Sequence, residues 1–285
     1  MRNKRVYFLL LVLLVLAYIC YITKTPLYEP MADLSKNVVC FLCVCPNEIV
    51  INFAKKIVKK YKVYIVCDDI YCVTPTEQDI TYIKISDEES MSKGYTKSSP
   101  PLNKDTSAWD KALYYFCVKD RIAQNVWFIE EDVFIPRVSI LSDIDEKYPT
   151  ADLIAKQNVS QDEDPDFFWW NDADGLIDKP FYRSLVCATR LSRNLLNKIS
   201  ELVESKKRLF FIEILFNTIV TQEDMELVMP EELSKIIWRH DWNIDIVDEN
   251  HMFHPIKDTR KQKDFRTVLS AKEGSKIEAF HPYRI

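Results

Sequence analysis

The amino-acid sequence predicts an α/β protein built on a mostly parallel central sheet with helices on its faces. Three apolar runs, at 37–45, 62–67 and 80–85, have the length and composition of strands buried on both faces. Between the first two runs, the segment 48–61 carries apolar residues at helical spacing with lysines between them. A strand, a helix and a second strand in this order indicate parallel strands joined by helical crossovers.

Composition narrows the range of functions. The 285-residue chain is 47% hydrophobic and 28% charged, as in an ordinary globular protein with a large core. Its net charge is −5 and no basic stripe is evident, so nucleic acid is not an expected partner. Because the chain has only three glycines, neither a GxGxxG loop nor a Walker-type loop can be written. A phosphate-bearing ligand would therefore need a cation to bridge it to this acidic chain.

The N-terminus carries a candidate membrane anchor. Arg2, Lys4 and Arg5 precede an uncharged run at 6–22, and a bilayer span needs roughly 17–25 such residues. A cleaved signal peptide is the rival interpretation, but its apolar core is typically about 7–15 residues long and ends in small residues. Basic residues stay in the cytosol, which places the rest of the chain outside it. The predicted parts are a cytoplasmic tail (1–5), a transmembrane signal anchor (6–22), a stem (23–36) and a globular domain (37–285).

Cysteine usage predicts buried thiols more than a metal cluster. The run 37–45 contains three of the eight cysteines, with no second CxxC motif or paired histidine, so we expect small buried side chains on a strand. With Cys20 in the anchor, an odd number remains, and at least one thiol must stay free. A Cys67–Cys72 disulfide is a candidate pairing.

The middle of the chain adds a loop, a helix and a fourth strand. The segment 86–106 is rich in serine, lysine and proline, which predicts a long surface loop, either a mobile lid or a plain linker. A helix is expected to begin at Ser107, with one apolar face that extends to Ile122. The run 126–129 is the fourth predicted strand.

The second half of the chain alternates a short strand with two helices. A fifth strand is expected at 151–155. Apolar spacing at 190–203 predicts an amphipathic helix, and the almost wholly apolar segment 209–220 predicts a buried one. Past Pro230 the pattern is irregular.

Acidic side chains follow two of the predicted strands. Asp68 and Asp69 come directly after 62–67, and the triplet 130–132 comes directly after 126–129. In an open parallel sheet, ligands bind beyond the carboxyl ends of the strands. Clustered carboxylates repel one another unless a cation joins them, and their oxygens suit Mg²⁺ or Mn²⁺ that also binds substrate phosphates. The alternative interpretation is a solvated acidic turn.

The segment 109–136 resembles GT-A-type glycosyltransferases. In that superfamily, a helix with a Lys-Ala step precedes a strand that ends in a D-x-D motif, often followed by an apolar residue and proline. Here WDKA stands at 109–112 and VWFIEEDVFIP at 126–136. The resemblance covers 37–136 well and the remainder in outline. Glu130 stands where the first aspartate is usual, and this longer acid can still bind a metal.

The resemblance implies a single GT-A-like, Rossmann-like domain and a metal-dependent transferase. Such an enzyme moves a sugar from a nucleotide-sugar donor to a glycan or glycoprotein acceptor, here as a type II membrane protein of the Golgi or ER lumen. Asp132 would be the principal ligand of Mn²⁺ or Mg²⁺, and Glu130 would assist directly or through water. The third ligand would come from a C-terminal histidine, for which His254 is preferred over His251.

The resemblance also implies donor contacts. Asp68 or Asp69 would contact the base and ribose of the nucleotide. Lys111 would reach the diphosphate, although a lysine on a helix surface can equally be solvated. Glu131, the middle residue of the acidic triplet, is a further candidate for binding the donor.

Glu213 is the candidate catalytic base. It is the lone acid in the apolar run 210–216, so its carboxyl should have a raised pKa that suits proton transfer near neutral pH. An inverting transferase needs such a base to take the acceptor hydroxyl proton. The alternative interpretation is a buried acid paired with Arg183 or Arg190.

Trp169 and Trp170 lie in an acidic, aromatic segment and either stack on a sugar ring or cap the core.

Two other functions of the chain remain open. One is a metal-dependent phosphotransferase or hydrolase that uses the same acidic cluster. The other is a non-catalytic lumenal carbohydrate-binding module that retains a transferase shape.

Overall fold

The computed structural model describes residues 36–280 of the chain. The predicted cytoplasmic tail (1–5), the signal anchor (6–22) and the stem up to residue 35 lie outside the described residues. Among the residues described, none of the helices is both long enough and apolar enough to cross a membrane.

A seven-stranded sheet with the order β3-β2-β1-β4-β8-β5-β9 forms the centre of the fold. Its strands are β1 (Asn37–Cys43), β2 (Lys62–Cys67), β3 (Ile80–Ile83), β4 (Asn125–Glu130), β5 (Leu153–Ile154), β8 (Ala188–Ser192) and β9 (Leu227–Val228). The pairs β1–β2, β1–β4, β2–β3 and β5–β9 are parallel, whereas β8 runs antiparallel to both β4 and β5. The prediction of a mostly parallel sheet is confirmed. A separate antiparallel pair consists of β6 (Val159–Ser160) and β7 (Tyr182–Arg183).

β1 lies inside the sheet because every one of its residues is apolar or can be hydrogen-bonded there. All seven residues are buried, and Asn37 donates its amide proton to Asp145 over 3.1 Å. Cys40 and Cys43 are free and buried on this strand, as the sequence predicts. β2 has the predicted bounds, since its apolar run is equally continuous.

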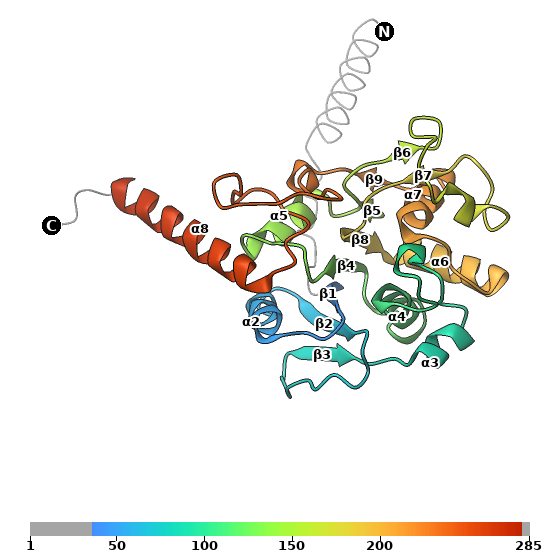
Figure 1. Ribbon diagram of the computed structural model, residues 1–285, viewed down its shortest axis with the longest axis horizontal. Helices are drawn as coiled ribbons and strands as arrows, with labels where there is room; N and C mark the ends of the chain where they lie inside the picture. Colours follow the sequence, from blue (N-terminus) through green and yellow to red (C-terminus); the bar gives the residue numbers. More distant parts are fainter. Residues whose placement is uncertain (1–35, 281–285) are drawn as a thin grey trace, which may run out of the picture. The chain divides into compact units, whose positions relative to one another are not determined.

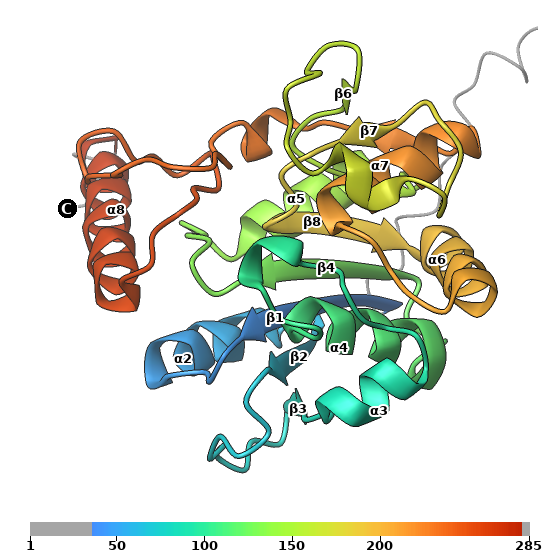
Figure 2. The same ribbon diagram turned by 45° about the vertical axis from the view of Figure 1, so that its right-hand side comes forward.

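Helices cover both faces of the sheet (Figure 2). One face packs against α2 (Glu48–Ile57) and α5 (Ser139–Lys147). The other face packs against α4 (Ala108–Tyr114), α6 (Arg193–Lys206) and α7 (Ile212–Gln222), with α3 (Asp87–Ser92) beside α4. Short helical turns occur at η2 (Pro100–Leu102), η3 (Tyr115–Lys119), η4 (Trp170–Ala173) and η5 (Glu231–Leu233).

A C-terminal helix, α8 (Thr259–Phe280), departs from the predicted irregular end of the chain (Figure 1). Its first half buries Phe265 and Leu269 in a small cluster with Phe134 and Phe253. Gln262 donates to the backbone oxygens of Glu131 and Ile256, both over 2.9 Å. Most residues of α8 are polar, so the sequence shows no apolar periodicity that would have predicted this helix.

The helix after Ser107 begins as predicted but ends early. Ser107 and Asp110 form a reciprocal capping box at its first turn. Helical structure stops at Lys119, because the Asp120 carboxylate accepts hydrogen bonds from the backbone N–H groups of Ile122 and Ala123. Ile122 is 79% exposed, so its predicted place on the apolar helix face is wrong.

Two other predicted elements differ in the structure. The segment 190–203 is not one helix, because Arg190 and Leu191 belong to β8 and the helix starts only after the Ser192 cap. The segment 86–106 is not a plain surface loop, since Ser86 caps α3 and Ser98 is buried against Asp110. Local polar side chains satisfy the backbone in both places, which composition alone does not reveal.

A buried ion pair joins β8 to α5. Arg190 Nη1 lies 2.6 Å from Asp145 Oδ1, and both side chains are fully buried. Tyr61 and Trp127 donate further hydrogen bonds to the Asp145 carboxylate, over 2.7 Å and 3.0 Å. Both charges are therefore paired and hydrogen-bonded, as burial requires.

The structure contains a disulfide between Cys45 and Cys72, so the candidate Cys67–Cys72 pairing is wrong. Cys67 is a core residue of β2. Cys45 follows the end of β1 and Cys72 follows the end of the neighbouring β2, which brings their Cα atoms to 5.7 Å. Among the described residues, Cys40, Cys43, Cys67, Cys117 and Cys187 are free and buried.

Candidate active site

A cavity of about 490 Å³ lies at the carboxyl end of β4, and we call it the first cavity. Its polar lining combines carboxylates, cationic side chains and a thiol: Glu130, Asp132, Glu213, Arg239, His240, His254, Lys257 and Cys187. Trp109, Phe211 and Trp238 supply aromatic walls. Carboxylates in the cavity lining can bind a divalent cation, and the cationic side chains beside them can bind the phosphate groups of the same ligand.

Strand pairing fixes two of these side chains. β4 and β8 are antiparallel, and the Glu130 N–H donates to the Cys187 carbonyl over 2.9 Å. Trp109, from the first turn of α4, donates its indole N–H to Glu130 Oε1 over 2.7 Å. Burial and the neighbouring Asp132 charge raise the pKa of Glu130 above its usual value.

His254 reaches the same place from the C-terminal part of the chain. Phe134 and Phe253 form an antiparallel bridge, and the Ile256 N–H donates to the Asp132 carbonyl over 2.7 Å. His254 Nδ1 lies 2.7 Å from the Ile237 carbonyl, which only accepts, so Nδ1 carries a proton. Nε2 therefore faces Asp132 Oδ1, 3.5 Å away.

The charge of Asp132 governs the ionisation of His254. Burial alone lowers the pKa of the imidazole, but the hydrogen bond and the negative charge of Asp132 outweigh it and raise that pKa. The carbonyl behind Nδ1 holds the ring and leaves Nε2 directed at the acids. Metal-binding histidines are commonly oriented in this way.

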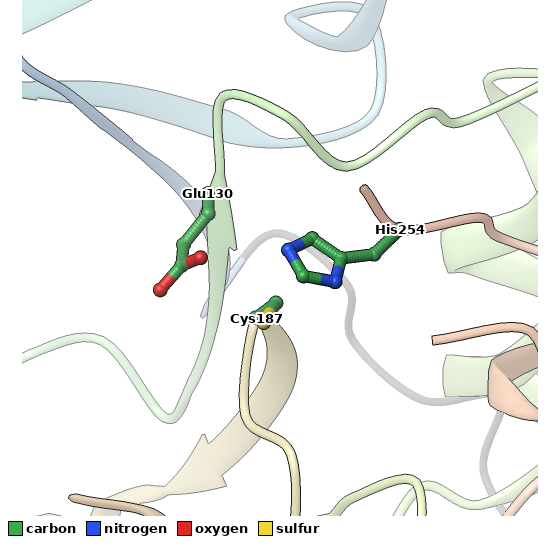
Figure 3. Close-up of side chains that lie close together, drawn as sticks. All are labelled: Glu130, Cys187 and His254. Carbon is green, nitrogen blue, oxygen red and sulfur yellow. The ribbon is translucent and has the colours of Figure 1, made fainter. Parts of the chain in front are cut away.

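Glu130, Cys187 and His254 form a cluster in which one ligand atom from each lies within 4.8 Å of the others (Figure 3). They come from the end of β4, the residue before β8 and the segment before α8. Burial, followed by the charges of Glu130 and Asp132, raises the pKa of the Cys187 thiol well above its usual value. Repelling carboxylates, an oriented imidazole and a thiol together fit a divalent cation.

Glu213 lies at a wall of the first cavity and is only 7% exposed. Burial and the nearby Glu130 charge raise its pKa to about 8, against the opposing charges of Arg183 and His254. Arg183 is ion-paired with Asp164, and Arg190 with Asp145. The described residues therefore show neither of the arginine pairings that sequence offered as the alternative interpretation of Glu213.

A second cavity of about 420 Å³ adjoins the first, with Pro101, Phe211, Glu213 and Trp238 in the lining of both. Its other walls are mainly aromatic: Phe167, Phe168 and Trp169, with Gln157, Arg183 and Leu185. Trp169 thus lines a cavity, whereas Trp170 is a core residue. Of the two alternatives from sequence, stacking on a sugar ring is open to Trp169, whereas Trp170 belongs to the core.

Asp68 and Asp69 border a different cavity of about 510 Å³, which we call the third cavity. β1 lies between β2 and β4, so the two acidic strand ends are not neighbours. Lys111 Nζ is ion-paired with Asp68 at 2.9 Å and with Asp87 at 2.8 Å, and its side chain is 1% exposed. The three predicted donor-binding residues Asp68, Asp69 and Lys111 are therefore absent from the lining of the first cavity.

Glu131 and His251 also lie away from the cluster. Glu131 lines none of the three cavities, whereas Glu130 and Asp132 on either side of it line the first. His251 Nδ1 lies 2.8 Å from Asp248 Oδ2, which explains its orientation without a metal. The geometry thus favours His254 as the C-terminal histidine of the cluster.

Among the charged and metal-binding side chains of the first cavity, sequence reasoning missed Arg239, Lys257 and Cys187. Lys257 stands close to the candidate His254 in the sequence, so proximity to that histidine was an available signal, whereas Arg239 stands beside no candidate histidine. Cys187 offered no signal, because it stands in an ordinary apolar run and joins Glu130 only through strand pairing.

No protein-family model matches the chain, and no curated protein matches it either. Among solved structures, it is similar to an active-site mutant of LgtC, with a TM-score of 0.45 and 11% identity over 82% of this chain and 96% of that one. It is also similar to apo mouse xyloside xylosyltransferase 1, with a TM-score of 0.34 and 9% identity over 68% of this chain and 84% of that one. These likenesses are too weak to carry a conclusion about function.

Proposed function

We propose that this chain is a metal-dependent glycosyltransferase that moves a sugar from a nucleotide-sugar donor to a glycan or glycoprotein acceptor. One observation carries the proposal: Glu213 lies between a cavity lined by metal-binding and cationic side chains and a second cavity lined by aromatic rings. The resemblance of 109–136 to GT-A-type enzymes agrees with this arrangement.

The first cavity supplies the donor site. Glu130, Asp132 and His254 would hold a divalent cation such as Mn²⁺ or Mg²⁺, which neutralises the leaving nucleoside diphosphate when bound. Arg239 and Lys257 line the same cavity and would bind the diphosphate oxygens directly. We therefore assign the binding of the diphosphate to Arg239 and Lys257 in place of Lys111, for which the resemblance implied that role.

The second cavity supplies the acceptor site. A sugar ring has an apolar face, which packs on aromatic side chains such as Trp169 and Trp238. Glu213 faces both cavities and would take the proton of the acceptor hydroxyl while that oxygen bonds to the anomeric carbon and the bond to diphosphate breaks. A pKa of about 8 lets this carboxyl exchange a proton near neutral pH.

We also propose that the chain works in an oxidising compartment, as a type II membrane protein of the Golgi or ER lumen. The apolar run at 6–22 with basic residues before it and the Cys45–Cys72 disulfide support this proposal. Protease treatment of intact microsomes tests it, since a lumenal domain is protected until detergent is added.

The activity is tested with purified full-length protein in detergent and a panel of nucleotide-sugars, with and without Mn²⁺. We expect nucleoside diphosphate release with one donor, a loss with chelator, and a fall of about 10²–10³-fold in Asp132→Ala. Asp264→Ala is the control, because Asp264 is exposed on α8 and lies outside the lining of the first cavity. Equal turnover in Asp132→Ala and wild type would remove Asp132 from the mechanism.

The same assay separates the two rival functions. Release of inorganic phosphate without sugar transfer would assign the cluster to a phosphotransferase or hydrolase. Donor binding without turnover, unaffected by chelator, would indicate a carbohydrate-binding module.

A further inference from the structure

The metal cluster contains a side chain that the D-x-D resemblance does not supply. Cys187 contributes a thiol to a set otherwise made of carboxylate and imidazole groups. Its place is fixed by the backbone, because the Glu130 N–H donates to the Cys187 carbonyl and the next residue begins β8. Both Cys187 and His254 line the first cavity, so a ligand entering it meets the thiol.

We propose that Cys187 binds the metal ion as a thiolate, so that the site prefers Zn²⁺ or a similarly soft divalent ion over Mg²⁺ and Mn²⁺. This inference deepens the proposed function, since it concerns the ion of the same donor site. It changes the chemical class of the cation from one held by oxygen and nitrogen to one held also by sulfur.

The distances suit such a site. Metal–ligand bonds to Zn²⁺ are about 2.0–2.3 Å long, so neighbouring ligand atoms around a tetrahedral ion lie roughly 3.3–3.7 Å apart. His254 Nε2 and Asp132 Oδ1 already have this spacing, at 3.5 Å. One ligand atom from each of Glu130, Cys187 and His254 lies within 4.8 Å of the others, which is close to the spacing that one shared ion requires.

The chemistry of the donor set points in the same direction. Zn²⁺ accepts cysteine, histidine and carboxylate ligands together, whereas Mg²⁺ prefers oxygen ligands and keeps several of its waters. Binding would form a metal–sulfur bond and release the thiol proton to solvent, so uptake of one ion should liberate a proton. A zinc site that takes part in catalysis keeps one position open, so three of the four side chains Glu130, Asp132, Cys187 and His254 would bind the ion and a diphosphate oxygen would take the fourth position.

Cobalt provides a direct test, because Co²⁺ bound to a thiolate has a charge-transfer band in the near ultraviolet. Full-length protein in detergent is stripped with a chelator and titrated with Co²⁺. We expect the band in the wild type, its loss in Cys187→Ser, and its full intensity in Cys117→Ser. Cys117 is a suitable control because it is also free and buried but lies in η3, outside the lining of the first cavity.

Competition measures the preference itself. Zn²⁺ should displace Co²⁺ in the wild type, and the Zn²⁺-over-Mn²⁺ affinity ratio should fall at least about tenfold in Cys187→Ser. Thermal unfolding of the stripped variant shows whether the substitution has harmed folding. If Cys187→Ser does not fold, Cys187→Ala is titrated in its place, and absence of the band in the wild type overturns the inference whether or not either variant folds.

Cobalt binding without the charge-transfer band would overturn the inference and leave Cys187 as a protonated donor to Glu130. A band that persists in folded Cys187→Ser would do the same. Failure of the proposed function looks different: the thiolate band would be present, but no nucleotide-sugar would be turned over. Conversely, sugar transfer with Mn²⁺ and no band would keep the transferase and reject the sulfur ligand.

Discussion

Replacing Glu213 with glutamine should change how stability depends on pH. The Glu213 carboxyl is buried in an apolar helix, and its pKa in the folded protein is about 8, against a usual value of 4.5. The folded state therefore holds this proton more tightly than the unfolded state does. Stability that depends on the protonated carboxyl is fully present below pH 4.5 and is lost as the pH rises through about 8.

The magnitude follows from the size of the shift. One pKa unit corresponds to about 1.4 kcal/mol, so a shift from 4.5 to about 8 amounts to about 5 kcal/mol when the carboxyl is fully ionised. At pH 7 the free energy of unfolding is about 3 kcal/mol lower than at pH values where the carboxyl is fully protonated in both states. Because Glu213 is only 7% exposed, solvent screens this charge little. Glutamine has the same shape and no charge, so Glu213→Gln should be more stable than the wild type at high pH.

Urea unfolding followed by tryptophan fluorescence, in chelator and over a series of pH values from 5 to 9, measures this effect. The difference in unfolding free energy between Glu213→Gln and the wild type should grow with pH and level off above pH 8. Glu201→Gln is the matched control, because Glu201 is exposed on α6 and its curve should run parallel to the wild type. A difference that stays constant with pH would show that Glu213 ionises normally in the fold and would remove the argument for it as a base.

Three further predictions concern other parts of the chain. Arg190→Met should lower the free energy of unfolding by about 3–5 kcal/mol in the same urea assay, because it leaves the buried Asp145 charge unpaired. Reduction of Cys45–Cys72, with its sequence separation of 27, should cost about 3–4 kcal/mol, measured by unfolding with and without dithiothreitol. Trp169→Ala should raise the KM for acceptor by about two- to tenfold in steady-state kinetics and leave the KM for donor unchanged, as loss of an aromatic contact implies.

Much of the fold was predictable because burial on both faces leaves a continuous apolar pattern. β2 has the predicted bounds, and the strand before Glu130 was placed to within one residue at each end. Glu130, Asp132 and His254, which a strand-end rule and a resemblance singled out, line one cavity together with Glu213, which its place in an apolar run singled out. These features depend on patterns that are local in sequence or shared with a known superfamily.

β8 was not predictable in the same way. Leu191, Leu195 and Ile199 satisfy helical spacing, so the short strand before α6 was read as the first turn of that helix. Arg190 pairs with β4 and β5 through its backbone, and the partner of its buried charge, Asp145, lies far away in the sequence. A single sequence gives no sign of such a partner, and Glu213 instead of Asp145 was the acid that sequence offered as a partner of Arg190.

The direction of β8 also explains why the thiol of the site escaped notice. In a wholly parallel sheet, the residue opposite the carboxyl end of β4 would come from the carboxyl end of its neighbour. Because β8 is antiparallel, Ile129 pairs with Ala188 and Asn125 with Ser192, so the start of β8 meets the end of β4. Cys187, which precedes β8, therefore lies beside Glu130. The strand that departs from the parallel pattern is the one that adds sulfur to the cluster, and predicting the site's chemistry required its direction as well as its residues.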